Sequence, residues 1–182
     1  MWGFDGEAVE LWKLAVQHAP KDSYKLFRLG SLYGELGQLE NAAVHLKLAV
    51  DLSPTWPQPA IELARVLLNL GQHQRALAHL SRLPREELKQ HVYGLFVLGH
   101  ALAANGHFGE ASWAFRRLTR IQPDNAGAYA DASLCLLDAL KRNPTASDRK
   151  EAIRLGRELW KEAHLRGDSR AKAAWETDGK NL

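Results

Sequence analysis

Apolar residues recur at helical spacing along most of the chain. In residues 23–56 the first such face is formed by residues three and four apart: Leu26, Leu29, Leu32, Tyr33 and Leu36. A second apolar face follows within the same segment, after Gly37. Because a glycine readily adopts the positive φ that ends a helix, we predict two antiparallel helices here, separated at Gly37.

The whole pattern repeats with a period of about 34 residues. Gly3, Gly37, Gly71 and Gly106 are separated by 34, 34 and 35 residues, which predicts a helix end at each. Two further columns keep this register, one of small residues and one of alanines: Gly30, Ala64 and Gly99, then Ala8, Ala42, Ala76 and Ala111. Small residues let paired helices approach closely. A single helix pair cannot bury its apolar face alone, so we expect the pairs to stack.

The columns resemble the tetratricopeptide repeat family, whose pattern is W-x₂-L-G-x₂-Y…A-x₃-F…P. The best match is residues 23–56, with Leu29-Gly30, Tyr33, Ala42, Leu46 and Pro54 in place. The resemblance implies an all-α, right-handed superhelical solenoid. It extends over nearly the whole chain.

On this resemblance we expect one domain over residues 1–182, divided at the repeat boundaries. The divisions are a half repeat at 1–22, three repeats at 23–56, 57–91 and 92–125, a degenerate fourth at 126–166, and a cap or tail at 167–182. Pro84 predicts a bent or shortened second helix in the second repeat, and about seven inserted residues lengthen the fourth at KRNPTASDRK. Trp160 and Trp175 are expected to pack at the C-terminal end.

Composition and charge favour a soluble, non-catalytic protein. The chain is 46% hydrophobic and 25% charged with a net charge of +3, and its basic residues are scattered, which argues against nucleic acid. The glycine-rich LGSLYGELGQLENAA lacks the Lys and Ser or Thr of a phosphate loop, and no two of the eight histidines are three or four residues apart. Cys135 lies in the apolar run SLCLL, where we expect an inert thiol. We predict no catalytic residue, no cofactor and no metal.

The resemblance implies a peptide or helix bound in a concave groove lined by the first helix of each pair. The expected groove residues are Tyr24, Phe27, Ser31, Gly34, Ile61, Arg65, Tyr93, Phe96 and His100. Aromatic and apolar side chains in such a strip suit an apolar partner, with Arg65 and His100 placed for an acceptor group. Gly34 has no periodic counterpart, and we expect its missing side chain to leave room for a ligand. The alternative is that these side chains pack against the neighbouring repeat.

The expected partner is a protein or peptide, without nucleic acid or membrane insertion. The N-terminal end lacks a cap, which predicts self-association, a preceding segment, or a partner that covers Val9, Leu11 and Trp12. The sequence is compatible with a cytoplasmic or a periplasmic setting. Residues 129–159 are similar to a lengthened repeat of bacterial cytochrome c maturation proteins. The alternative function is a regulatory or substrate-docking domain of a larger enzyme or of an export or assembly machine.

Overall fold

The computed structural model describes residues 3–143, 145 and 148–182, and these residues form helices and no strand. The predicted all-α class is therefore confirmed. The chain separates into two compact units, the first ending at Leu83 and the second beginning at Pro84. Each unit is described by itself, and the expected single domain over residues 1–182 stays a prediction.

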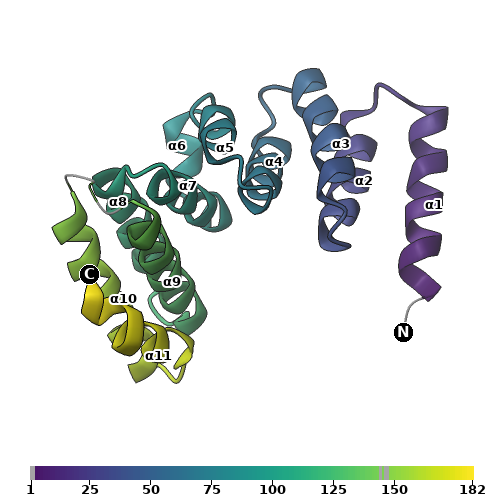
Figure 1. Cartoon of the computed structure of the whole chain (residues 1–182). Coiled ribbons are helices and arrows are strands. Elements are labelled where there is room, and N and C mark those ends of the chain that lie inside the picture. Colours follow the sequence, from purple (N-terminus) through teal and green to yellow (C-terminus); the bar gives the residue numbers. More distant parts are fainter. Residues whose placement is uncertain (1–2, 144, 146–147) are drawn as a thin grey trace. The chain divides into compact units, whose positions relative to one another are not determined.

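The first unit contains five helices, in which each helix packs against the next (Figure 1). They are α1 (Gly3–His18), α2 (Ser23–Glu35), α3 (Leu39–Leu52), α4 (Pro57–Asn69) and α5 (His73–Leu80). The pair α2 and α3 lies within residues 23–56, and α4 begins the next pair. Gly3 is the first residue of α1, so the predicted helix end at this glycine is wrong.

The second unit contains the remaining helices and ends in a short 3₁₀ turn (Figure 1). They are α6 (Arg85–Leu88), α7 (Val92–Ala104), α8 (Phe108–Ile121), α9 (Ala126–Arg142), α10 (Arg149–Leu165), α11 (Arg170–Thr177) and η1 (Asp178–Asn181). The helix α5 has only eight residues and is followed by Pro84 and α6, as predicted for a shortened second helix. The predicted insertion falls between α9 and α10, and its residues 144, 146 and 147 lie outside the described residues.

Four glycines with positive φ follow the ends of helices. They are Gly37 (74°), Gly71 (73°), Gly106 (81°) and Gly167 (92°), of which the first three were predicted from the 34-residue period. In each case the next residue donates its backbone N–H to a carbonyl five residues earlier, as Gln38 does to Tyr33 at 2.9 Å. This geometry satisfies the last carbonyls of the helix and requires glycine at the turn.

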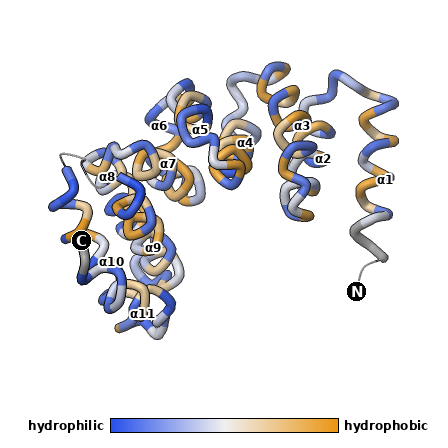
Figure 2. The backbone as a smooth tube through the Cα atoms, viewed as in Figure 1, coloured by the Kyte–Doolittle hydropathy of each residue, from blue (hydrophilic) through white to orange (hydrophobic). Residues whose placement is uncertain are grey.

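Small residues on the first helix of a pair make room for large ones on the second. A Cβ built on Gly30 would lie 2.7 Å from Cγ of Leu46, and one built on Gly99 would lie 2.6 Å from Cε1 of Phe115. Leu46 and Phe115 are fully buried. The predicted packing role of both glycines is confirmed. Figure 2 shows hydrophobic residues alternating with hydrophilic ones along these helices, as expected for helices that bury one face.

The helix α11 covers the C-terminal end of the second unit, as predicted for a capping helix. Gly156 of α10 stands in the register of Leu46 and Phe115, and Trp175 of α11 packs over it. A Cβ on Gly156 would lie 2.2 Å from Cζ2 of Trp175, whose indole N–H donates to the carbonyl of Ser133 at 3.3 Å. Trp175 therefore provides the bulk that the repeat itself lacks at this position.

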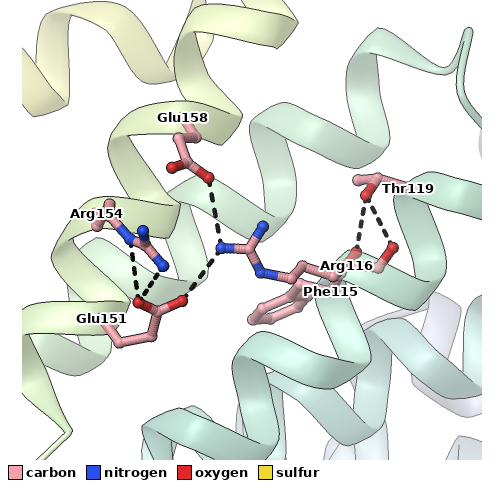
Figure 3. A network of polar contacts seen from close by, with 6 residues as sticks. All are labelled: Phe115, Arg116, Thr119, Glu151, Arg154 and Glu158. Carbon is pink, nitrogen blue, oxygen red and sulfur yellow. Dashed lines mark hydrogen bonds and ion pairs between the residues drawn. The ribbon is translucent and has the colours of Figure 1, made fainter.

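An ion-pair network links α8 to α10 (Figure 3). The guanidinium of Arg116 lies 3.1 Å from a carboxylate oxygen of Glu151 and 3.5 Å from one of Glu158. Arg154 also pairs with Glu151 at 2.6 Å. Burial raises the pKa of Glu151, but hydrogen bonds from Arg116 and Arg154 outweigh burial and hold this pKa below its ordinary value.

Candidate interaction surface

Four aromatic side chains gather in the first unit, and we call Trp12, Tyr24, Phe27 and Trp56 the aromatic cluster. The rings of Tyr24 and Trp56 are stacked with centroids 6.2 Å apart. Phe27 meets Trp56 edge to face at 4.9 Å, and Trp12 meets Tyr24 in the same way at 6.3 Å. Both arrangements are favourable aromatic geometries, so the four rings form one continuous surface contributed by α1, α2 and the turn before α4.

Local sequence fixes the two segments that carry the central rings. The carboxylate of Asp22 accepts hydrogen bonds from the backbone N–H groups of Tyr24 and Lys25 at 3.0 and 3.2 Å, which caps α2 just before Tyr24. Trp56 precedes Pro57, the first residue of α4, and is held extended with φ −86° and ψ 111°. The stacked pair is therefore placed by a helix cap on one side and by a proline on the other.

The aromatic cluster is open to solvent and carries a cationic edge. Tyr24 is 50% exposed, and the other three rings are half-buried. The guanidinium of Arg28 lies 5.3 Å from the ring centroid of Trp12, and its Nη1 donates to the hydroxyl of Tyr24 at 3.3 Å. A partner on this surface therefore meets flat apolar faces beside one positive charge.

Two members of this cluster were not among the predicted site residues. Trp12 was expected at the uncapped N-terminal end and not in the groove, and Trp56 lies in a turn between repeats, where helical periodicity gives no orientation. The sequence feature that could have identified Trp56 is a tryptophan directly before Pro57, the proline that begins α4. Its proximity to Tyr24 and Phe27 depends on the packing of α2 against the segment after α3.

The space expected to receive a ligand at Gly34 is filled by Arg65. A Cβ built on Gly34 would lie 2.7 Å from Nη2 of Arg65 and 3.4 Å from Cγ2 of Val66. Arg65 in turn donates from Nε to a carboxylate oxygen of Glu62 at 2.9 Å. The expectation of ligand space at Gly34 is therefore wrong. The absence of a side chain at Gly34 leaves room for the guanidinium of Arg65, which belongs to the next repeat.

Ile61 and Ser31 also differ from the expected open strip. Ile61 is 1% exposed, because α4 buries apolar side chains on nearly every side, so the expectation that Ile61 lines a groove is wrong. Ser31 is half-buried, and its hydroxyl oxygen is buried with no hydrogen-bond partner among the described residues. The apolar surface of the first unit is therefore centred on Tyr24 and Trp56.

The remaining predicted residues lie together on α7 in the second unit. Tyr93 is 40% exposed, whereas Phe96 and His100 are half-buried. The ring of Phe96 lies 6.4 Å from that of His100 and 6.4 Å from that of the buried Phe115. Phe96 thus packs partly on the core of its own pair, and Tyr93 is the most accessible of the three. The predicted site residues accordingly form two sets, one in each unit.

The remaining candidate chemical groups are the Cys135 thiol and the side chains that can hold a metal ion. Burial raises the pKa of the Cys135 thiol to about 12, which keeps this sulfur protonated and unreactive. Among residues 3–143, 145 and 148–182, no group of three or more His, Cys, Asp or Glu side chains is placed to hold a metal ion. Within the same part of the chain, every helix is too short or too polar to cross a membrane.

Comparison with known proteins agrees with the helix pairs. Residues 34–95 match the tetratricopeptide repeat family model. This segment therefore carries the tetratricopeptide repeat pattern. Among solved structures, YrrB, described as a tetratricopeptide protein with an unusual peptide-binding site, is 19% identical with a TM-score of 0.65 over 89% of this chain and 81% of its own. MamA from Desulfovibrio magneticus RS-1 is 17% identical with a TM-score of 0.69, covering 91% and 89%. At these identities the similarity concerns the fold.

One curated relative is considerably longer than this chain. The BBSome complex member BBS4 homolog of Drosophila melanogaster is 25% identical over 148 residues, which are 81% of this chain. The chain spans about 30% of the length of that relative.

Proposed function

We propose that this tetratricopeptide protein is a non-catalytic scaffold whose aromatic cluster binds an apolar peptide or helix of a protein partner. The observation that carries the proposal is the stacked pair of Tyr24 and Trp56, with Tyr24 half exposed at the surface. Large aromatic rings held by a cap and a proline lose little freedom on binding, and such residues dominate the energy of many interfaces.

The chemistry of the aromatic cluster restricts the kind of peptide that it can bind. Its rings favour apolar side chains, and Arg28 at its edge favours a carboxylate or another acceptor next to them. The tetratricopeptide fold supports a role in protein–protein interaction in general, and the description of YrrB as a peptide-binding protein is consistent with this class of ligand. Tyr93, Phe96 and His100 provide a second, smaller contact surface in the second unit.

The experiment is a selection of peptides from a displayed random library on the immobilised chain, followed by affinity measurement of the selected peptides. We expect apolar peptides with an acidic residue, and at least tenfold weaker binding to Tyr24→Ala. Trp113→Ala is the matched control, because Trp113 is 45% exposed on α8 and lies outside both candidate sets. If Tyr24→Ala and Trp113→Ala bind the peptides as tightly as the unchanged chain, the aromatic cluster is not the binding surface.

A second candidate is a docking domain within a larger assembly, such as a regulatory domain of an enzyme or a subunit of an export machine. The relative named as a member of the BBSome complex favours this candidate, since it is a longer protein of a multi-subunit assembly. Co-purification of a stable complex that survives Tyr24→Ala would favour it over peptide capture by the aromatic cluster. The similarity of residues 129–159 to cytochrome c maturation proteins stays a prediction.

A further inference from the structure

One face of α1 carries an exposed stripe of four residues, Glu7, Leu11, Leu14 and His18. Their intervals of four, three and four place them on one side of the helix. Leu11 is 68% exposed and Leu14 51% exposed, and Glu7 and His18 at the two ends of the stripe are exposed as well. Leu11 and Leu14 lie one turn apart and form an apolar strip, which makes this face of α1 a candidate contact surface.

The stripe is distinct from the face by which α1 joins its own unit. Val9 is 7% exposed, and Trp12 contacts Tyr24 of α2, so these residues mark the side of α1 that packs on α2. By the rotation of 100° per residue, Leu11 and Leu14 project from the other side. The stripe is therefore available to a second molecule without any change in the first unit.

The order of the residues along the stripe indicates which molecule fits. We propose that α1 pairs with α1 of a second copy of this chain, in antiparallel orientation. The spacing reads the same from both ends, so Leu11 faces Leu14 of the second copy, and Glu7 faces His18 of the second copy. Each contact occurs twice around a two-fold axis, as in an isologous dimer.

Charge complementarity selects the antiparallel orientation. Glu7 lies in the first half of α1 and His18 in its last turn, whereas Glu10 and Lys13 pair with each other within the helix at 2.7 Å. An antiparallel pair brings the carboxylate of Glu7, a hydrogen-bond acceptor, against the imidazole N–H of His18 of the second copy, and it also opposes the two helix dipoles favourably. A parallel pair would place Glu7 against Glu7 of the second copy and lose both advantages.

The contact is small, since it consists of one helix from each copy. We expect a weak, reversible dimer that dissociates on dilution, in keeping with interfaces below the standard size. The inference is independent of the proposed function, because the two leucines lie outside the aromatic cluster.

The test is sedimentation velocity of the full chain over a concentration series. We expect the unchanged chain to dimerise, and Leu11→Glu and Leu14→Lys each to shift dissociation to at least tenfold higher concentration. Mixed in equal amounts, the two variants should dimerise again. In the mixed dimer, the glutamate at position 11 of one copy faces the lysine at position 14 of the other, and the second contact keeps Leu14 against Leu11. Both positions are exposed, so neither change disturbs folding.

The control is Leu165→Glu, which alters a leucine 77% exposed in the second unit and should leave the dimer unchanged. A second arm uses Glu7→Lys, which should weaken the dimer, and the double variant Glu7→Lys, His18→Glu, which should restore it. A chain that remains monomeric at several hundred micromolar overturns the proposal. A dimer that persists in both leucine variants, or that Leu165→Glu disrupts, overturns it equally. So does a mixture of the two leucine variants that fails to associate.

Discussion

Nη2 of Arg65, on α4, lies 2.7 Å from the position that a Cβ at Gly34 of α2 would take. A side chain at residue 34 would therefore displace the guanidinium from its place between the two helices. Gly34 thus makes room for a neighbour within the fold, as Gly30 does for Leu46, although the neighbour here is the flexible end of a long polar side chain. The two glycines differ in what stands against them, and this difference predicts different costs of substitution.

We predict that Gly30→Ala destabilises the protein and that Gly34→Ala does not. At residue 30 the new methyl meets Cγ of Leu46 at 2.7 Å and backbone atoms at 3.0 and 3.2 Å, none of which can move freely. Overpacking costs about 1–3 kcal/mol, partly offset by about 1 kcal/mol of helix propensity. Urea unfolding should show a net loss of up to about 2 kcal/mol for Gly30→Ala.

Gly34→Ala should stay within about 1 kcal/mol of the unchanged chain, since Arg65 can swing aside and alanine favours the helix. It should also keep the affinity for a peptide bound at the aromatic cluster. If the variant folds normally but loses that peptide, then Gly34 contributes to the ligand site, contrary to the role assigned to it here.

Removal of the Trp175 side chain, which packs over the C-terminal end of the second unit, should lower the free energy of unfolding. Trp175 is 4% exposed over Gly156, so Trp175→Ala leaves a cavity at the end of the second unit, and we expect a loss of about 3–5 kcal/mol. The matched variant Trp113→Ala removes a tryptophan that is 45% exposed and should cost clearly less. Equal losses from the two variants in chemical denaturation would show that α11 does not cap the unit as described.

Acid should remove the contribution of Glu151. The pKa of this carboxyl is below its ordinary value of 4.5 in the folded chain, so its stabilisation is complete above that value and is lost as the pH falls through the lower, folded pKa. Glu151→Gln should cost less than about 1 kcal/mol at pH 7, because the pair with Arg116 is partly exposed.

The difference in unfolding free energy between the unchanged chain and Glu151→Gln should then close in acid, as the pH falls below 4.5 and through the lower, folded pKa. Urea titrations of both proteins at pH 7, 5 and 3 measure it. A difference that grows as the pH falls would contradict the described network.

The single cysteine should be unreactive in the folded chain. With its pKa raised to about 12 by burial, Cys135 is almost entirely a thiol at pH 8 and lacks the thiolate that attacks a disulfide reagent. Modification by an aromatic disulfide reagent should be slow in the native protein and rapid in guanidinium chloride. Rapid native modification would mean that the apolar face around Cys135 opens readily.

Much of the fold could be predicted from the sequence because its determinants recur. The turn at Gly37 and the contact between Gly30 and Leu46 each have counterparts one or two repeats away, and the structure has both. Each of these features is decided by residues within one helix pair. The 34-residue period of the sequence therefore predicts these turns and contacts directly.

The candidate site was predictable only in part because it depends on contacts between pairs. Tyr24 and Phe27 were found, but Trp56, which joins them, lies in a turn outside the helical pattern. Ile61 shares the register of Phe27, yet it is buried, since its helix is covered on more sides than that of Phe27. Helical periodicity gives the face on which a residue lies, and packing between pairs decides what covers that face.

The most direct test of the aromatic cluster as a binding surface is the indole N–H spectrum of the chain, recorded by nuclear magnetic resonance during titration with a selected peptide. Tryptophans stand at six positions, so each indole signal can be assigned by substitution. The proposal predicts that the signals of Trp12 and Trp56 shift, whereas those of Trp113, Trp160 and Trp175 stay in place. Unchanged signals of Trp12 and Trp56, with shifts at the other three, would contradict it.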